Sequence, residues 1–515
     1  MDAREKALSF AVKAILGGER DLDRLKKEAT QKFKCGFFRN TELMERMPRE
    51  KLTPELVSLL KRKPMRTLSG VAPIAVMIKP ENSCRWGCIY CPYTGKAPKS
   101  YTGSEPAALR ARSNSFNPAR QVRSRLRQFE LNGHPTDKCD LILMGGTFLS
   151  MDKRYKSEFV KGIYDGLNGK RSRTLEAAKR LNEAAEHRIA GLTIETRPDV
   201  CTEPQIDEML AYGATKVELG VQHPSDSIYR RISRGHSVSD VINSTASLKD
   251  SAFKVAYHIM PGLPGSSPKK DLLMFKSLFS KQEFRPDMLK IYPTLVIPGT
   301  KLHELMLAGA YTPYSTETAA EVIAKAYSYI PKYVRVMRVQ RDIPANLIAG
   351  GVKKSNLREL VERKVVSLGI TMNEMRCREA GLNHKPVNEP VLRRIEYRAS
   401  RGKEIFISIE DRKSQALAAF LRLRIPAHPH RKEITDETAL VRELHVYGQE
   451  TALGEKGEFQ HRGLGSALLS EAEKISAEEL DMKKMAVISA VGVKPYYRLR
   501  GYSDDGPYVS KSFVR

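Results

Sequence analysis

Short apolar segments recur from about residue 71 onward, each separated from the next by a longer polar stretch of helical character. Their nearly continuous apolar composition is typical of strands that are covered on both faces. They read VAPIAVMI (71–78), CDLILMGG (139–146), GLTIET (191–196), KVELGVQ (216–222), KVAYHIM (254–260) and MLKIYPTLVI (288–297). This alternation predicts an α/β fold with a parallel sheet, in the form of a TIM-like barrel or partial barrel. In such barrels the chemistry lies at the C-terminal ends of the strands.

The regions that flank this pattern differ from it. Residues 1–70 are basic and helical, and Pro48, Pro54 and Pro64 divide them into short helices. Residues 331–390 are basic, helical and irregular, which indicates a connector. A second α/β pattern follows, with strands expected at 404–409, 416–425, 439–447 and 484–490 and a helix at about 463–480. The predicted division is therefore 1–70, 71–330, 331–390 and 391–515.

The composition adds a large excess of positive charge. The 515 residues carry a formal net charge of +27, while 41% are hydrophobic and 29% are charged, as in ordinary globular proteins. Such an excess attracts polyanions, so nucleic acid is the first candidate partner; a generally basic surface without that role is the alternative. No apolar run is long enough to span a membrane, and the N-terminus lacks a signal-peptide pattern. We therefore expect a cytoplasmic protein with no membrane partner.

Three of the seven cysteines fall within eight residues. Cys84, Cys88 and Cys91 form a CxxxCxxC motif directly after the first predicted barrel strand. Three thiolates on a short loop can bind three irons of a 4Fe–4S cluster and leave the fourth iron open to a small molecule. The alternative is structural zinc, which needs four ligands; the nearest later candidates are His134 and Cys139. The motif favours an open iron–sulfur site.

The position of this motif resembles that of the radical S-adenosylmethionine (SAM) superfamily. In that superfamily SAM binds the open iron and is cleaved to a 5′-deoxyadenosyl radical. The strand end Gly145-Gly146-Thr147 resembles the superfamily's glycine-rich segment, which holds the SAM amino group. Glu195 and Gln222, at two further strand ends, are candidate SAM contacts by position.

A second motif, Gln460-His-Arg-Gly463-Leu464-Gly465, precedes the helix predicted at about 463–480. Glycines at a helix start let backbone N–H groups approach a pyrophosphate, and the helix dipole adds attraction. The preceding strand offers backbone edges to a pantetheine arm, and Tyr496 and Tyr497 follow in a short final helix; one of the two tyrosines is expected to be a core residue. This order of elements resembles a GNAT-type acyltransferase domain.

A basic stretch with interleaved aromatic residues runs through residues 96–128. Arg120, Arg123 and Arg127 share one helix face by spacing, and Glu105 is the only acid in the stretch. Guanidinium groups and aromatic rings suit an RNA backbone and splayed bases, whereas a solvated helix face would normally also carry acids. A second predicted basic stretch comprises Arg335, Arg338, Arg341, Lys353, Lys354 and Arg358.

Longer segments carry a closer resemblance. YTGSEPAALRAR (101–112), MGGTF (144–148), ETRPD (195–199), YPTLVIPGT (292–300), RELHVYG (442–448) and VKPYYRLRGY (493–502) closely resemble the catalytic-subunit family of Elongator, in its stand-alone archaeal and bacterial form. The resemblance implies 5-carboxymethyluridine synthesis at the tRNA wobble position, with the anticodon region as partner. A SAM-derived radical would activate acetyl-CoA for addition to carbon 5 of uridine. An electron-donor protein is implied, and other Elongator subunits are not expected to be required.

The resemblance also implies site residues. Cys84, Cys88 and Cys91 would hold the cluster and belong, with Lys138 and Tyr497, to the catalytic set. The acetyl-CoA contacts would be Lys138, Glu443, Leu444, His445, Val446, Leu464, Gly465, Ser466 and Tyr497, beside Gln460, Gly463 and Tyr496 from the motifs above. Some prokaryotic relatives carry a cysteine-rich connector; here the connector has only Cys377, so we predict no connector zinc.

Two alternatives remain open at this point. The GNAT-type pattern also fits a protein lysine acetyltransferase in which the cluster is structural. A non-catalytic tRNA-binding or assembly scaffold would need SAM cleavage to be absent.

Overall fold

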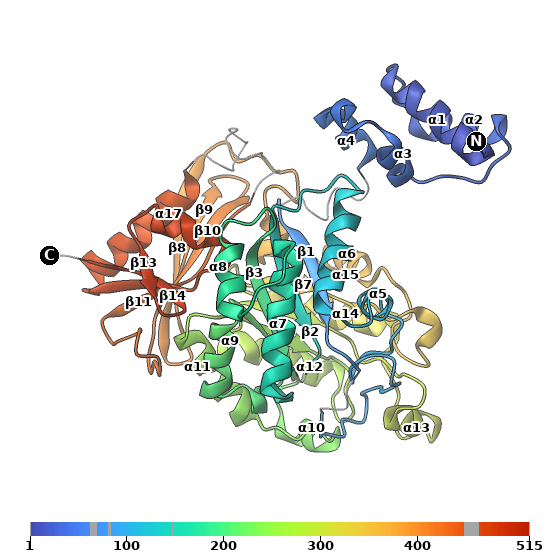
Figure 1. The fold of residues 1–515 in the computed structure, drawn as a ribbon. Helices are drawn as coiled ribbons and strands as arrows, with labels where there is room; N and C mark the ends of the chain where they lie inside the picture. The colour runs from blue at the N-terminus through green and yellow to red at the C-terminus, as the bar shows by residue number, and fades with distance from the viewer. Residues whose placement is uncertain (1, 62–69, 81–83, 147, 448–462, 514–515) are drawn as a thin grey trace.

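The computed structural model describes residues 2–61, 70–80, 84–146, 148–447 and 463–513, which build two sheets and a separate group of N-terminal helices (Figure 1). The N-terminal group consists of α1 (Ala3–Leu16), α2 (Leu22–Lys32), α3 (Asn40–Arg46) and α4 (Pro54–Leu60). These helices share a small core of their own around Ala11, Leu43 and Leu60. Figure 1 places them on the side of the first sheet that faces away from the C-terminal domain.

The first sheet is parallel throughout, with its strands in sequence order. Its strands are β1 (Ala72–Met77), β2 (Lys138–Met144), β3 (Arg188–Thr196), β4 (Lys216–Gln222), β5 (Lys254–Ile259), β6 (Met288–Ile291) and β7 (Arg335–Arg338). Within the described residues no pairing joins β7 to β1, so the sheet is a partial barrel, as the sequence predicted.

Helices surround this partial barrel; most cover its outer face, and α10 and α13 lie beyond one end of its strands (Figure 1). They are α5 (Pro106–Ser113), α6 (Pro118–Glu130), α7 (Lys153–Asn168), α8 (Leu175–Asn182), α9 (Glu203–Ala211), α10 (Asp226–Arg231), α11 (Val238–Asp250), α12 (Pro268–Ser280), α13 (Lys301–Leu307), α14 (Thr316–Ala326), α15 (Leu357–Ser367) and α16 (Met375–Arg378). Local sequence sets their starts: Asn117 caps α6 by accepting from the Arg120 N–H, and Pro118 occupies the first turn, where its missing N–H costs nothing. Among the described residues, none of the helices has the length and apolar character that crossing a membrane requires.

The second sheet has the order β13-β14-β12-β11-β10-β9-β8. Its strands are β8 (Pro390–Ala399), β9 (Gly402–Asp411), β10 (Leu417–Ile425), β11 (Thr438–Val446), β12 (Lys484–Val487), β13 (Ser503–Asp505) and β14 (Tyr508–Ser512), with helices α17 (Leu464–Lys474) and α18 (Lys494–Arg498). Only β11 and β12 are parallel, and their pairing ends at Val441 and Val487. Beyond that point β11 continues to Val446 beside β10 alone, so a gap opens on its other edge.

Buried ion pairs join the two sheets. Arg442 on β11 donates to Asp287 Oδ2 at 2.8 Å and to the Phe253 carbonyl at 2.6 Å, both in the partial barrel. Arg424 on β10 donates from Nε to Asp250 Oδ1 at 2.8 Å. Arg442, Arg424 and Asp287 have no exposed surface, which makes the two sheets one packed body.

The structure corrects three details of the predicted elements. The segment 288–297 is a strand only to Ile291; its remainder is a loop in which Val296 bridges to Gly350. The seventh barrel strand, β7, lies inside the predicted connector 331–390. β8 has a mostly half-exposed face with charged residues, so it lacks the apolar run that marks a strand in sequence, and it was missed.

Candidate active site

The three motif cysteines line one cavity of about 260 Å³ at the C-terminal ends of the barrel strands. Backbone hydrogen bonds fix their loop to two neighbours: Ile89 N–H donates to Ile232 O at 3.1 Å, and Leu302 N–H donates to Ile89 O at 2.9 Å. Lys99 Nζ donates to the carbonyls of Cys84 and Trp86. The loop is therefore held from both sides before any ligand binds.

Two arginines place positive charge beside the thiols. Arg234 Nη1 lies 3.6 Å from Cys88 Sγ and Arg197 Nη1 lies 3.9 Å from it. Burial opposes ionisation of Cys88, but the two guanidinium groups outweigh it and hold the thiol pKa below its ordinary value. Cys91 is buried near two other sulfurs, so its pKa is raised to about 12.

This donor set fits an iron–sulfur cluster better than zinc. Three soft thiolates share the cavity, and cations near them suit a ligand group of net negative charge. The candidate fourth zinc ligands lie elsewhere: Cys139 is buried near the start of β2, with Sγ 3.3 Å from the Thr136 carbonyl, and His134 packs edge-on against Phe129. Neither lines the cavity.

The predicted SAM-binding strand ends meet at this cavity. Gly146, Glu195 and Gln222 line it, whereas Thr147 lies outside the described residues. Gly145 has φ +136°, and a Cβ there would come within 2.5 Å of Ile78, so only glycine fits this turn. Gln222 also has a positive φ, +67°, which is uncommon for a non-glycine residue and occurs most often where function needs a fixed geometry.

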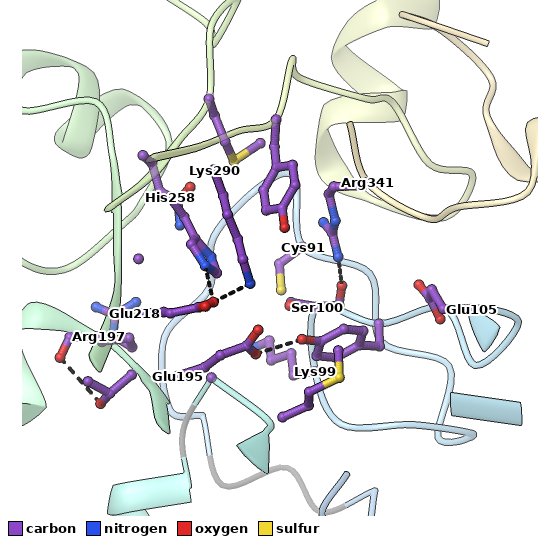
Figure 2. Close-up of a pocket in the computed structure, with 18 of the residues that line it drawn as sticks. Cys91, Lys99, Ser100, Glu105, Glu195, Arg197, Glu218, His258, Lys290 and Arg341 are labelled. Atoms are coloured by element: carbon purple, nitrogen blue, oxygen red, sulfur yellow. Dashed lines mark hydrogen bonds and ion pairs between the residues drawn. The ribbon is translucent and has the colours of Figure 1, made fainter. Parts of the chain in front are cut away.

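A buried charged group on the inner face of the strands was missed from the sequence (Figure 2). Glu218 Oε2 lies 2.8 Å from His258 Nε2 and also accepts from Lys290 Nζ. Glu195 accepts from Tyr101 Oη at 2.7 Å. Burial opposes the ionised form of Glu218, but Lys290 and His258 lower its pKa well below the usual range. A signal was available in the sequence, because Glu218, His258 and Lys290 stand at strand positions that would be apolar in a filled barrel.

A second cavity, of about 440 Å³, lies between the two sheets at the opposite, N-terminal ends of the barrel strands. It occupies the gap where β11 and β12 separate. Of the residues predicted to bind acetyl-CoA, Glu443, Leu444, His445 and Tyr497 line it. Lys138 begins β2 at this same end, half-exposed and 4.0 Å from Asp137; it does not line the cavity. It therefore lies at the opposite end of β2 from the cysteine loop.

The N-terminus of α17 lies beside this gap. Gly463 caps it with φ +80°, and the first hydrogen bond of the helix runs from Ala467 N–H to Gly463 O, which leaves three earlier N–H groups without a helical partner. A Cβ on Gly465 would lie 2.9 Å from Tyr496 Oη. Arg500 donates to Ser466 Oγ and stacks on Tyr496, with 3.6 Å from its guanidinium carbon to the ring. Gln460 lies outside the described residues, and Val446 is half-buried near Gly465.

Tyr496 and Tyr497 differ as expected. Tyr497 is buried in the core of the C-terminal domain, and Tyr496 is half-exposed.

Both predicted basic stretches are only partly on the surface. On α6, Arg120, Arg123 and Arg127 are exposed on one side, while Arg125 packs over Phe129 at 4.1 Å.

The second basic stretch is more divided. Arg335 pairs with Glu379 and donates to Tyr447 Oη of the C-terminal domain. Its side chain is therefore half-buried in this contact and does not belong to a surface patch. Arg338, Lys353 and Lys354 are exposed. Arg341 lines the cysteine cavity and donates to Ser100 O at 2.5 Å (Figure 2). Arg110 of α5 lines the same cavity. Positive charge therefore extends from the surface into the mouth of the cavity.

Known proteins match this chain along most of its length. The Radical SAM superfamily matches residues 78–275, and the Radical_SAM C-terminal domain matches residues 286–366. The tRNA uridine(34) acetyltransferase of Methanocaldococcus infernus is 47% identical over 506 residues, 95% of each chain. Elongator complex protein 3 of Saccharomyces cerevisiae is 41% identical over 492 residues, covering 92% of this chain and 88% of its own.

Among solved structures, the archaeal Methanocaldococcus infernus Elp3 with an N-terminal deletion (1–46) superposes with a TM-score of 0.79 at 46% identity, covering 87% of this chain and all of its own. Identity of this extent, over both sheets, leaves no doubt about common descent. The chain belongs to the radical SAM family of tRNA uridine(34) acetyltransferases and Elongator complex protein 3.

Proposed function

We propose that this protein modifies the wobble uridine of tRNA, attaching to carbon 5 a carboxymethyl group derived from acetyl-CoA. The relatives named tRNA uridine(34) acetyltransferase support the substrate. One observation carries the proposal furthest: a three-cysteine cavity and an acyl-CoA-type groove occupy the two ends of a single barrel. An exposed arginine face lies on the helices that lead to the cysteine end.

Cys84, Cys88 and Cys91 would hold a 4Fe–4S cluster, with Arg234 and Arg197 offsetting its negative charge. With SAM bound, such a cluster supplies a 5′-deoxyadenosyl radical once an electron-donor protein has reduced it. Gly145 and Gly146 would leave space beside the cysteine loop for the amino group of SAM. Glu195 and Gln222 offer acceptors and donors to the polar groups of SAM from the neighbouring strands.

The acetyl-CoA site would follow the gap between β11 and β12. The N–H groups of Leu464, Gly465 and Ser466, which have no partner within the helix, would take the pyrophosphate beside Gly463. By the family resemblance Gln460 would belong to the same site. Backbone groups of Glu443, Leu444, His445 and Val446 would pair with the pantetheine arm, whose end would meet Tyr497 beside Tyr496. Lys138 would pair with a CoA phosphate from the barrel side.

The anticodon region of the tRNA would bind at the cysteine cavity. Arg120, Arg123 and Arg127 would contact phosphates, and Arg110 and Arg341 would guide the wobble nucleotide into the cavity. Residues 1–70 would add a basic helical arm to this interface. The gap in the C-terminal domain faces the base of the barrel.

The test is an anaerobic reaction of the cluster-loaded protein with SAM, acetyl-CoA, a reductant and a full tRNA pool. The proposal predicts 5-carboxymethyluridine at the wobble position and 5′-deoxyadenosine in the supernatant, both lost in Cys84→Ser. Absence of the modified nucleoside from a cluster-loaded enzyme would reject the proposal. Acetylation of peptides that survives Cys84→Ser would favour the acetyltransferase alternative, and absence of 5′-deoxyadenosine would favour a scaffold.

A further inference from the structure

The two cavities are the two ends of one barrel interior. Inward-facing residues alternate along each strand, and the same inward row serves both cavities. On β4, Lys216 lines the interdomain cavity and Glu218 lines the cysteine cavity; on β6 the corresponding residues are Met288 and Lys290. Two residues of a strand span only about 6.6 Å. A thin section of the barrel therefore separates the cavities.

Part of this section is filled by small residues, where closed barrels of this kind carry bulky branched side chains. Ala75 on β1 and Gly191 on β3 line the cavities, and Thr193 and Ala256 face the section between them by alternation along their strands. Larger neighbours that line the two cavities are Ile142 on β2 and Lys254 on β5. Glu218 and Lys290 form a buried ion pair beside them.

The proposed reaction requires the acetyl carbon and the SAM-derived radical to meet. The acetyl-CoA groove opens at the N-terminal ends of the strands, and the cysteines stand at the C-terminal ends, with Lys216 and Gln222 at opposite ends of β4. The rise from Lys216 to Gln222 is about 20 Å. The tRNA cannot enter from the groove side, because the C-terminal domain covers that end of the barrel through Arg442 and Arg424.

We infer that the barrel interior is a binding site for the thioester end of acetyl-CoA, which passes through it from the interdomain cavity to the cysteine cavity. This inference rests on the proposed function. The Glu218–Lys290 pair, braced by His258, closes the passage when no arm is present. Small residues at Ala75, Thr193 and Ala256 leave room for an arm once that pair moves aside.

Thiol trapping tests this directly, with mass rather than turnover as the readout. The probe is the mixed disulfide of coenzyme A with methanethiol, whose S–CH₃ group is similar in length to the acetyl group of acetyl-CoA. In a Thr193→Cys variant of the full-length, cluster-loaded protein, the new thiolate attacks the coenzyme A sulfur, the probe's S–S bond breaks, and methanethiolate leaves. Mapped peptides should gain one coenzyme A at position 193, and excess acetyl-CoA should prevent the gain.

Two further variants make the result decisive. Ser489→Cys places a thiol in the interdomain cavity, and Ala324→Cys places one in a buried helix outside the barrel interior, as an unreactive control. Labelling of Ser489→Cys without labelling of Thr193→Cys would overturn the passage while leaving the acetyl-CoA site intact. Labelling of neither would overturn the acetyl-CoA site in the proposed function as well.

The ion pair can be tested in the same assay. Combining Thr193→Cys with Glu218→Gln keeps the side-chain shape but removes the charge that holds Lys290. Labelling at position 193 should then be at least several-fold faster. An unchanged rate would show that this pair does not close the passage.

Discussion

Several single residues of this protein carry charge at positions that the fold buries away from water. Arg234 and Arg197 lie within 4 Å of Cys88 Sγ, and Glu218 and Lys290 pair inside the barrel. Burying such groups costs free energy unless each has a partner, and each of these groups has one nearby. The cysteines were predictable because their spacing is local in sequence. Glu218 and Lys290 were hidden, because each stands alone within an apolar strand and meets its partner only through the barrel. Arg197 and Arg234 were hidden because they lie in loops far from Cys88 in sequence.

His223 gives a residue-scale prediction on acid stability. It is 6% exposed, its ring nitrogens have no hydrogen-bond partner among the described residues, and Nε2 lies 3.6 Å from Asp271 Oδ1. Burial lowers its pKa to about 4. Between pH of about 6.5 and about 4 the unfolded chain therefore binds more protons than the folded chain, and stability falls as the pH falls through this window, by up to about 3 kcal/mol.

Urea unfolding from pH 7 to pH 4 checks this prediction. His223→Phe removes the titrating group but keeps an aromatic ring, so its stability should fall less steeply over the same window. Burial raises the pKa of Asp271, which is present in both proteins, so the comparison isolates His223. An equally steep fall in the variant would show that His223 is not the cause.

At the scale of elements, short segments present backbone and charge to ligands. The turn into α17 and the exposed side of α6 are the two clearest cases. Both were visible in sequence, one through its glycines and the other through arginine spacing. β7 and β8 were not, because a strand of four residues and a half-exposed strand rich in charge carry no continuous apolar run.

Gly463→Ala should weaken acetyl-CoA binding. Its φ of +80° costs a non-glycine residue about 1 kcal/mol, and relaxation would move the N–H groups at the start of α17. We expect about a fivefold rise in the Kd for acetyl-CoA by calorimetry. Gly169→Ala is the matched control, because Gly169 ends α7 with φ +69° and open space around it. Equal effects of both variants on binding would contradict a role for this turn.

Arg120→Gln with Arg127→Gln should weaken tRNA binding by removing two phosphate contacts. The slope of log Kd against log salt should fall by about 2. Arg180→Gln, on the exposed side of α8, serves as the control for loss of surface charge and should leave the slope unchanged. A double variant with the wild-type slope would show that tRNA binds elsewhere.

At the scale of the whole molecule, the two sheets act as one unit because charges from one are buried in the other. Sequence pattern predicted both sheets and their order along the chain. It could not place the interdomain cavity at the base of the barrel, because that arrangement depends on contacts such as Arg442 with Asp287, which are far apart in sequence.

Arg442→Met should destabilise the whole protein. It removes one of the cations that pair with the buried carboxylates of Asp287 and Glu404, which keep Lys249, and breaking a buried pair costs up to about 3–5 kcal/mol. Urea unfolding should record this loss in a single transition. The exposed Arg338–Asp342 pair is the control, and Arg338→Met should cost less than about 1 kcal/mol. A similar small cost for both variants would argue against an interface held by Arg442.

In the proposed reaction, one barrel brings an acetyl methyl group, a SAM-derived radical and a wobble uridine together. Trideuterated acetyl-CoA tests it most directly, in the anaerobic reaction with SAM, reductant and tRNA. The account predicts one deuterium in 5′-deoxyadenosine and two in the carboxymethyl group of the wobble nucleoside. Modified uridine formed without deuterium in 5′-deoxyadenosine, or 5′-deoxyadenosine formed without any modified uridine, would contradict it.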